Sequence, residues 1–195
     1  MCDDRRAAVA ARAVLLVVLL ALAASRPAVA DEPVWAVLAG GGQVVLIRHA
    51  ITTPGVGDPP GMRLDDCDTQ RNLTDEGRRH ARRVGEAVRA HGVPIDRVLS
   101  SPWCRCLETA RLAFGSAETW APLANLFGRP EHRDEQVRHL QAIAAERRRG
   151  GNLVLVTHGS TIAALTGINP DTAEMVVLTP QGAGRFAVAG RLTVR

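Results

Sequence analysis

The sequence of 195 residues predicts a single α/β domain, a three-layer α/β/α sandwich with a mainly parallel sheet. Short apolar segments with the composition of buried strands alternate along the chain with longer segments of helical periodicity. The length suffices for one domain with a substantial core, and a hydrophobic content of 46% is ordinary for a globular protein. Strands that alternate with helices favour a parallel sheet covered on both faces.

The first thirty residues have the organisation of a secretory signal peptide. Three arginines precede an apolar stretch, which is followed by an A-x-A cleavage motif: Arg5, Arg6, Arg12, residues 13–24 and Ala28-Val29-Ala30. The apolar stretch is short for a membrane span, although an uncleaved anchor is the alternative. We therefore expect a signal peptide at 1–30, a linker at 31–42 and one domain at 43–195. The mature protein is expected to be periplasmic or secreted, without stable membrane insertion.

The elements of the domain begin with a strand at 43–47, which is short, apolar and β-branched. Residues 53–71 are rich in Gly, Pro and Asp and predict a long loop, and long loops in compact domains tend to be functional. Thr74 can cap a helix that ends before Gly92.

The second half of the chain continues the same alternation. The expected elements are a strand at 97–100, a helix at 102–114, an irregular segment at 115–130, a helix at 131–149, a strand at 152–157, a helix at 160–167 and strands at 176–178 and 185–194. The last two strands are expected to be antiparallel and to lie at an edge of the sheet.

The net charge argues against a nucleic-acid partner. It is +4 for the whole chain, and removing the four arginines and two aspartates of the first thirty residues lowers it to about +2. Nucleic-acid-binding domains are usually far more basic and carry their charge in a patch. We therefore expect a small phosphorylated substrate, for reasons given by the motifs below, and no nucleic acid; the sequence leaves the oligomeric state open.

Three cysteines follow the predicted cleavage site: Cys67, Cys104 and Cys106. In an oxidising compartment Cys67 could form a disulfide with either of the other two, and buried reduced cysteines are the equal alternative. The odd number leaves at least one thiol unpaired within the chain. A zinc site is not expected, because no second cysteine pair or nearby histidine pair completes it.

Polar residues follow the buried strands where each strand ends. Arg48 and His49 follow the first strand, His158 follows the strand at 152–157, and Arg105 lies in the first turn of the helix after the strand at 97–100. Because the carboxyl ends of parallel strands share one edge of a sheet, where ligands bind, we expect these four side chains to line one crevice.

That set of side chains suits a phosphate dianion. Two guanidinium groups can bind phosphoryl oxygens in bidentate fashion. Neighbouring positive charge lowers the pKa of an imidazole, which can then remain neutral, attack phosphorus and carry the phosphoryl group. The arginines and the second histidine can stabilise the charge on the equatorial oxygens. Nothing in this set requires a metal or another cofactor.

Four segments resemble the motifs of the histidine phosphatase superfamily, in its phosphoglycerate mutase-like branch, branch 1. They are L-I-R-H-A at 46–50, N-L-T-D-E-G at 72–77, S-S-P-W-C-R-C-L-E-T-A at 100–110 and V-L-V-T-H-G at 154–159. They follow the order of the family and together span most of the chain after the leader.

The resemblance implies a phosphoglycerate mutase-like sandwich and a phosphatase that hydrolyses phosphomonoesters through a phosphohistidine, without metal. His49 would be the phosphorylated nucleophile, and Arg48, Arg105 and His158 would bind the phosphoryl group. Thr52 matches a threonine of the family motif and is expected to contact phosphate.

Three positions depart from the family pattern, one of them Gly55, where the family often has Asn. Ala50 replaces the signature glycine, and Asn125 stands where many members have the glutamate that donates a proton to the leaving group. An amide cannot supply a proton as a carboxylic acid does. Glu131 is the next candidate for the proton donor, and Asp65 and Asp66 in the long loop are others.

Other functions are compatible with the same motifs. A mutase would return the phosphoryl group to another hydroxyl, but the predicted leader argues against a cytosolic role. The ester could also be protein phosphohistidine or a sugar phosphate, of which the second fits an exported enzyme better. Asn125 favours a third alternative, a catalytically weak phosphate-binding envelope protein. Function depends on the site and not on the fold alone.

Overall fold

A computed structural model describes residues 31–194 of the protein, so the signal peptide predicted for residues 1–30 lies outside the described part. The helices are α2 (Glu32–Ala39), α3 (Asp75–Ala90), α4 (Cys104–Phe114), α5 (Arg133–Ala145) and α6 (Gly159–Thr166). The strands are β1 (Val44–Arg48), β2 (Ile95–Ser100), β3 (Glu118–Thr119), β4 (Asn152–Thr157), β5 (Met175–Gly182) and β6 (Arg185–Leu192). Three single 3₁₀ turns lie at Cys67–Thr69, Ala121–Leu123 and Pro130–His132.

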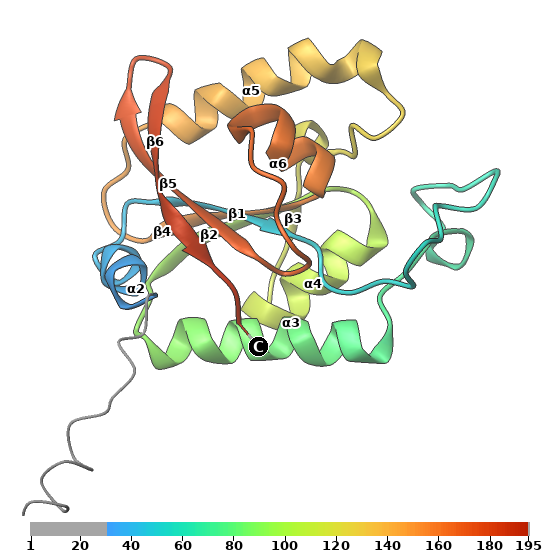
Figure 1. The fold of residues 1–195 in the computed structure, drawn as a ribbon, viewed down its shortest axis with the longest axis horizontal. Helices are drawn as coiled ribbons and strands as arrows, with labels where there is room; N and C mark the ends of the chain where they lie inside the picture. The colour runs from blue at the N-terminus through green and yellow to red at the C-terminus, as the bar shows by residue number, and fades with distance from the viewer. Residues whose placement is uncertain (1–30, 195) are drawn as a thin grey trace, which may run out of the picture. The chain divides into compact units, whose positions relative to one another are not determined.

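The strands form one sheet in the order β3-β2-β4-β1-β5-β6 (Figure 1). β1 and β2 both pair with β4 in parallel, and β3 pairs with β2 in parallel. β5 is antiparallel to β1, and β6 is antiparallel to β5. The predicted fold class and the antiparallel position of the last two strands are therefore confirmed.

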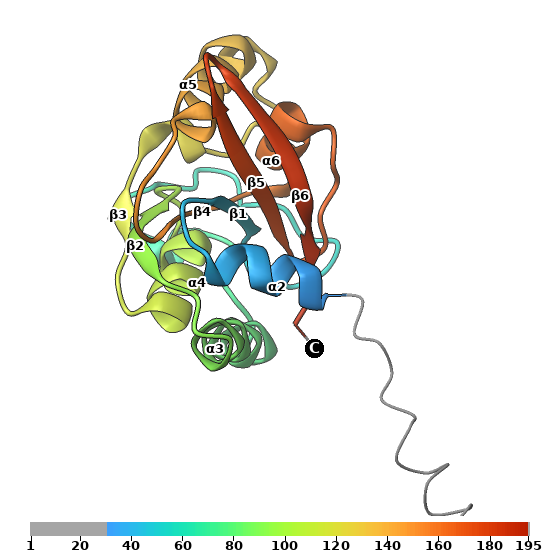
Figure 2. The ribbon, with the colours of Figure 1, turned by 90° about the vertical axis from the view of Figure 1, so that its left-hand side faces the viewer.

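Helices cover both faces of the sheet, as Figures 1 and 2 show: α2, α3 and α4 on one face and α5 and α6 on the other. The alternation of side chains along β1 explains the two cores, since Val45 and Ile47 join one hydrophobic cluster and Val44 and Leu46 join the other. A strand that is buried on both faces is continuously apolar, which is the pattern from which it was predicted.

The segment 31–42, predicted to be a linker, instead contains helix α2. Trp35 and Leu38 are buried in the core cluster on that face of the sheet. These two residues lie three apart and therefore on one side of a helix, and Pro33 is compatible with its first turn. The ordered domain thus begins well before β1.

Several boundaries also differ from the prediction. α4 begins at Cys104 and not at Pro102, and β2 begins at Ile95. α5 is shorter at both ends than the predicted 131–149, and it starts later because Pro130 begins a separate 3₁₀ turn. The predicted cap of α3 is confirmed, since Thr74 Oγ1 accepts a hydrogen bond from the N–H of Gly77 at 3.0 Å.

Two glycines of α3 allow the close approaches that place the site. A Cβ at Gly77 would lie 2.1 Å from the carbonyl oxygen of Ile51, two residues after His49. A Cβ at Gly85 would lie 2.1 Å from the carbonyl oxygen of Ala113 in α4. Both positions exclude a side chain, so α3 holds the end of β1 and the helix that carries Arg105 together. None of the helices in residues 31–194 is long and apolar enough to cross a membrane.

Candidate active site

The four predicted side chains meet in one pocket of about 730 Å³ at the carboxyl ends of the parallel strands. Arg48 ends β1 opposite Thr157 of β4, and His158 follows directly. Arg105 enters from the first turn of α4, after β2. The other residues that line the pocket come from the loop at 53–71, from Trp103, from the segment 125–129 and from the start of α6 and the residues after it.

His49 is buried and holds one defined tautomer. Its Nδ1 lies 2.9 Å from the carbonyl oxygen of Ala50. A carbonyl only accepts, so Nδ1 carries the proton and Nε2 keeps its lone pair. Burial lowers the pKa of His49 to about 3, and the positive charges of Arg105 and Arg48 also lower it. The hydrogen bond to Ala50 raises the pKa but does not outweigh these effects. The imidazole is therefore neutral near pH 7.

His158 is the second neutral imidazole of the pocket. Its ring lies 5.5 Å from that of His49, between ring centroids. Its Nδ1 accepts from Arg105 Nη2 at 3.4 Å, since a guanidinium can only donate, and its Nε2 donates to Ser101 Oγ at 2.8 Å. Burial lowers the pKa of His158 well below its usual value, and the charge that His49 carries when protonated and the charges of the arginines lower it further.

The arginines supply hydrogen-bond donors to the pocket. Arg105 is fully buried, which is rare for a charged side chain. Arg48 donates from Nη1 to the carbonyl of Pro170 at 2.8 Å. Within the described residues, the Nε atoms of Arg48, Arg71 and Arg105 are buried without a hydrogen-bond partner. Two arginines elsewhere also have a buried Nε without a partner, so one such atom does not by itself mark a binding site. Three of them around one pocket indicate a site for an anion.

Thr109 connects the end of β1 to α4. Its Oγ1 accepts from the N–H of Ala50 at 3.0 Å and donates to the carbonyl of Arg105 at 2.7 Å. Ala50, the departure from the signature glycine, is fully buried and its backbone does not have a positive φ. A methyl group is therefore accommodated at this position without strain.

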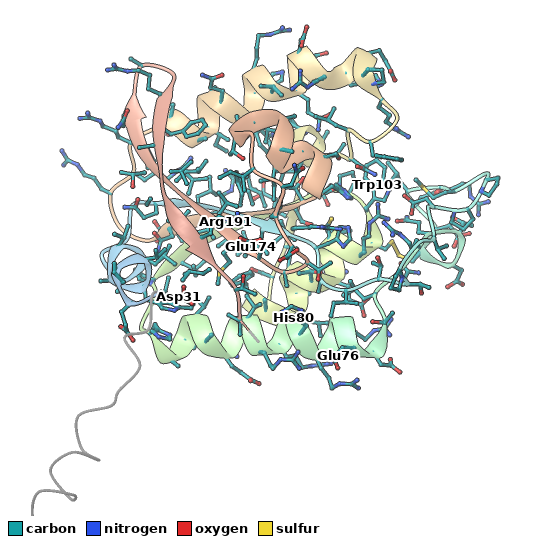
Figure 3. All side chains as sticks on the ribbon, viewed as in Figure 1. Asp31, Glu76, His80, Trp103, Glu174 and Arg191 are labelled. Atoms are coloured by element: carbon teal, nitrogen blue, oxygen red, sulfur yellow. A yellow bond between two sulfur atoms is a disulfide. The ribbon has the colours of Figure 1, made fainter. Side chains whose placement is uncertain are left out.

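Asp58 is the pocket residue that the sequence analysis missed. Its Oδ1 accepts from Arg105 Nη1 at 2.7 Å and its Oδ2 accepts from Nη2 at 3.1 Å. Oδ2 also accepts from Trp103 Nε1 at 3.2 Å, and Oδ1 accepts from the N–H of Arg71 at 3.2 Å. Figure 3 places Trp103 on the side of the domain where the loop 53–71 projects. The one available signal was that this loop was expected to be functional.

The charge state of Asp58 follows from these contacts. Partial burial raises its pKa, but the hydrogen bonds and charge of Arg105 outweigh this and hold the pKa below its usual value. The carboxylate is therefore ionised in the free protein.

Several predicted residues do not reach the pocket. Thr52 is buried beside Leu73 and is not among the residues that line it. Glu131 is exposed, with its carboxylate 3.4 Å from His132 Nε2, so it does not stand where a proton donor would be needed. Asp65 and Asp66 pair with Arg63 at the surface of the loop. Asn125 does line the pocket.

A disulfide joins Cys67 in the loop to Cys104, the residue before Arg105. Of the two pairings left open by the sequence, the structure contains this one, and Cys106 is a buried free thiol. Burial raises the pKa of Cys106 to about 12, so it is not a nucleophile. The N–H of Cys104 also donates to Gln70 Oε1 at 3.0 Å, which fastens the loop to α4 a second time.

Within residues 31–194, no cluster of three or more His, Cys, Asp or Glu side chains is arranged to hold a metal ion. The groups that face the pocket are instead four arginines, two neutral histidines and one carboxylate: Arg48, Arg71, Arg105, Arg129, His49, His158 and Asp58. Such a set can bind an anion and present one imidazole lone pair to it.

Comparison with known families identifies the class. The sequence model of the histidine phosphatase superfamily (branch 1) matches residues 44–132, a range that contains β1, α3, β2 and α4. This range is somewhat less than half of the chain, and over it the sequence is similar to the histidine phosphatase superfamily, with which the fold agrees. No curated protein sequence matches the chain.

Solved structures of the same fold include several phosphatases. The protein histidine phosphatase SixA complexed with tungstate has a TM-score of 0.56 at 19% identity, over 77% of this chain and 96% of that one. The protein of open reading frame Rv3214 from Mycobacterium tuberculosis has a TM-score of 0.59 at 19% identity, over 78% and 98%. A putative alpha-ribazole-5'-P phosphatase from Escherichia coli has a TM-score of 0.56 at 17% identity, over 76% of this chain and 94% of that one. At these identities the likeness establishes the fold.

Proposed function

We propose that the protein is a phosphatase that hydrolyses small phosphomonoesters through a phosphohistidine intermediate on His49, without a metal. The observation that carries this proposal is the fixed, neutral tautomer of His49 in a pocket lined by arginines. A neutral imidazole whose Nδ1–H is held by a carbonyl presents Nε2 as a nucleophile.

In the first step, His49 Nε2 forms a bond to phosphorus while the bond from phosphorus to the ester oxygen breaks, and the leaving oxygen takes up a proton. In the second step, water attacks the phosphohistidine, the bond between phosphorus and Nε2 breaks, and inorganic phosphate is released. Arg48 and Arg105 would stabilise the equatorial oxygens in both steps. His158 would gain a proton at Nδ1 and add a third donor, because a bound dianion raises its pKa.

The Nδ1–H of His49 has its own role in this scheme. A phosphorylated imidazole carries positive charge, which the carbonyl of Ala50 stabilises at 2.9 Å from Nδ1. The same hydrogen bond fixes the ring, so little orientation is lost when the substrate binds.

We also propose that the enzyme acts outside the cytoplasm. The leader motif supports export, and the Cys67–Cys104 disulfide suits an oxidising compartment. Expression of the full chain, followed by cell fractionation and N-terminal sequencing of the product, should give a periplasmic or secreted protein that starts at Asp31. A membrane-bound product that starts at Met1 would contradict export with cleavage.

The activity is tested by hydrolysis of p-nitrophenyl phosphate by the protein from Asp31 onward, with and without a chelator. The His49→Ala variant is compared with His132→Ala, whose side chain is exposed outside the pocket. We expect turnover that resists the chelator, persists in His132→Ala and falls at least 10³-fold in His49→Ala. Rapid acid-free quenching should trap phosphate on wild type and on His132→Ala, but not on His49→Ala.

Two outcomes would redirect the proposal. Phosphate binding without turnover would favour the phosphate-binding protein that Asn125 suggests. Turnover that persists in His49→Ala would exclude the phosphohistidine route.

A further inference from the structure

The proposed reaction needs a proton donor, and the residues predicted for this role do not face the pocket. Among the described residues that line it, Asp58 is the one carboxyl group. Its carboxylate lies on both Nη atoms of Arg105 and accepts from Trp103 and from the backbone of Arg71. The pocket therefore contains a potential donor, but in the free protein it is held as a carboxylate.

The Asp58 carboxylate occupies the Nη atoms of Arg105 as a bound anion would. A bidentate pair with a guanidinium is the geometry in which Arg binds a carboxylate or a phosphate. Arg105 has no exposed surface, so a phosphoryl group that reaches its Nη atoms must take the place of Asp58.

The loop can accommodate this exchange. Gly55 and Gly57, just before Asp58, have no heavy atom within 4 Å of a Cβ built on them. The backbone at these two glycines is unpacked. The loop is held further along, where Met62 packs against the core cluster, Gln70 bonds to α4 and Cys67 forms its disulfide with Cys104. Displacement of Asp58 from Arg105 therefore need not disturb the core.

We propose that Asp58 is the proton donor to the leaving group. In the free protein its carboxylate is paired with Arg105, and the substrate's phosphoryl group displaces it from that arginine. This inference rests on the proposed function. Once displaced, Asp58 loses its partner and gains a dianion as neighbour, and both changes raise its pKa. The groups that oppose protonation are the cations and imidazoles of the pocket: Arg48, Arg71, Arg105, Arg129, His49 and His158.

The proton balance closes over one turnover. Displaced Asp58 takes its proton from the substrate monoanion or from solvent. It gives that proton to the ester oxygen as the bond between oxygen and phosphorus breaks and the bond from phosphorus to His49 Nε2 forms. The resulting carboxylate then takes a proton from the water that attacks the phosphohistidine, and acid, imidazole and phosphate result.

The test compares esters whose leaving groups need different amounts of protonation. p-Nitrophenoxide leaves without help, whereas phenoxide and an alkoxide such as that of glycerol 2-phosphate need a proton. Wild type, Asp58→Asn and the rival-donor variant Glu131→Gln are assayed on all three. Asp58→Asn keeps the size of the side chain and its ability to accept a hydrogen bond from Arg105, but it has no proton to give.

We expect Asp58→Asn to keep p-nitrophenyl phosphate hydrolysis within about tenfold and to lose about 10²–10³-fold on the other two esters. In the pH profile of kcat on phenyl phosphate, the fall at alkaline pH that deprotonation of Asp58 causes should also disappear in Asp58→Asn. Glu131→Gln should match wild type on all three. An equal loss on every ester, no selective loss, or a selective loss in Glu131→Gln would overturn the proposal.

A binding measurement tests the exchange separately from turnover. Asp58→Ala removes the carboxylate that occupies Arg105, so it should bind inorganic phosphate about tenfold more tightly than wild type by calorimetry. Unchanged or weaker binding would overturn the exchange and with it the proposal. If wild type hydrolyses none of the esters, the proposed function fails, and the proton-donor role fails with it, whereas the calorimetry still decides whether Asp58 competes with phosphate.

Discussion

Burial keeps the His49 imidazole neutral near pH 7 and makes it a cost to stability at low pH. The unfolded chain has an imidazole pKa of 6.5, and the folded protein lowers it to about 3. Between these values the unfolded state binds a proton that the folded state does not. The contribution of His49 to stability is therefore fully present above pH 6.5 and is lost as the pH falls towards 3, by at most about 1.36 kcal/mol per pH unit.

The prediction at this position is that His49→Asn flattens the acid side of the stability profile. Asparagine can still donate to the carbonyl of Ala50, but it takes up no proton. Urea unfolding at pH 7.5 and at pH 4.5 should reveal a smaller loss of unfolding free energy in His49→Asn than in wild type. His132→Asn, at an exposed site, should lose as much as wild type. An equal loss in all three proteins would contradict the lowered pKa.

Ala50 provides a second prediction at the scale of one residue. Its methyl group is fully buried, and its backbone needs no glycine. Ala50→Gly should therefore destabilise the protein by about 1–2 kcal/mol, because it removes a buried methyl and adds backbone freedom to the unfolded chain. Activity on p-nitrophenyl phosphate should stay within about twofold. A marked gain in activity would mean that the methyl obstructs the substrate. The two measurements are chemical denaturation and the phosphatase assay.

At the scale of elements, the loop at 53–71 and helix α4 act as one unit. The loop carries Asp58 and Arg71, and α4 carries Arg105. The Cys67–Cys104 disulfide joins the two elements and closes a loop with a sequence separation of 37. Constraining the unfolded chain over such a separation stabilises the fold by about 2–4 kcal/mol.

Replacing both cysteines, in Cys67→Ala/Cys104→Ala, should lower the free energy of unfolding by that amount. It should also weaken phosphate binding, because the loop that positions Arg71 at the pocket then keeps its hydrogen bonds to α4 but loses its covalent link to that helix. Thermal unfolding with and without a reducing agent checks this. The reducing agent should lower the Tm of wild type and leave that of the double variant unchanged. A wild-type Tm that does not respond would argue against the disulfide.

At the scale of the whole molecule, positive charge is concentrated where the strands end. The chain as a whole is only weakly basic, yet four arginines and one carboxylate line the pocket. A cleft lined by one sign of charge attracts ligands of the opposite sign, and salt screens this attraction over about 10 Å at 0.1 M. Arg129 lies at the exposed rim, with its guanidinium 5.4 Å from the ring centre of Trp103.

Arg129→Gln should therefore lower kcat/KM for a phosphate ester by about threefold with little change in kcat. It should also make the decline of kcat/KM between low and high salt less steep, because the variant lacks a positive charge that attracts the anionic substrate to the pocket. Arg82→Gln, on the exposed face of α3, is the matched control and should behave as wild type. Steady-state kinetics at several salt concentrations gives both quantities, and a kcat loss in Arg129→Gln would indicate a direct role in the chemistry instead.

The sequence by itself determined helices α3 to α6, the strands other than β3, and the convergence of four side chains: Arg48, His49, Arg105 and His158. These follow from local periodicity and from one rule, that parallel strands end at a common edge. The cap at Thr74 was also readable, since it depends on neighbours within one turn.

Only the tertiary structure decided which distant groups meet. Residues two apart on a helix point about 200° apart, so Cys104 faces the loop and Cys106 the core, and sequence spacing could not choose between them. Likewise, Trp35 and Leu38 pack in the core, Glu131 lies outside the pocket, and Asp58 reaches Arg105 from an irregular loop. A loop has no periodicity to reveal where its side chains point, and the partner of a buried charge is fixed by the whole fold.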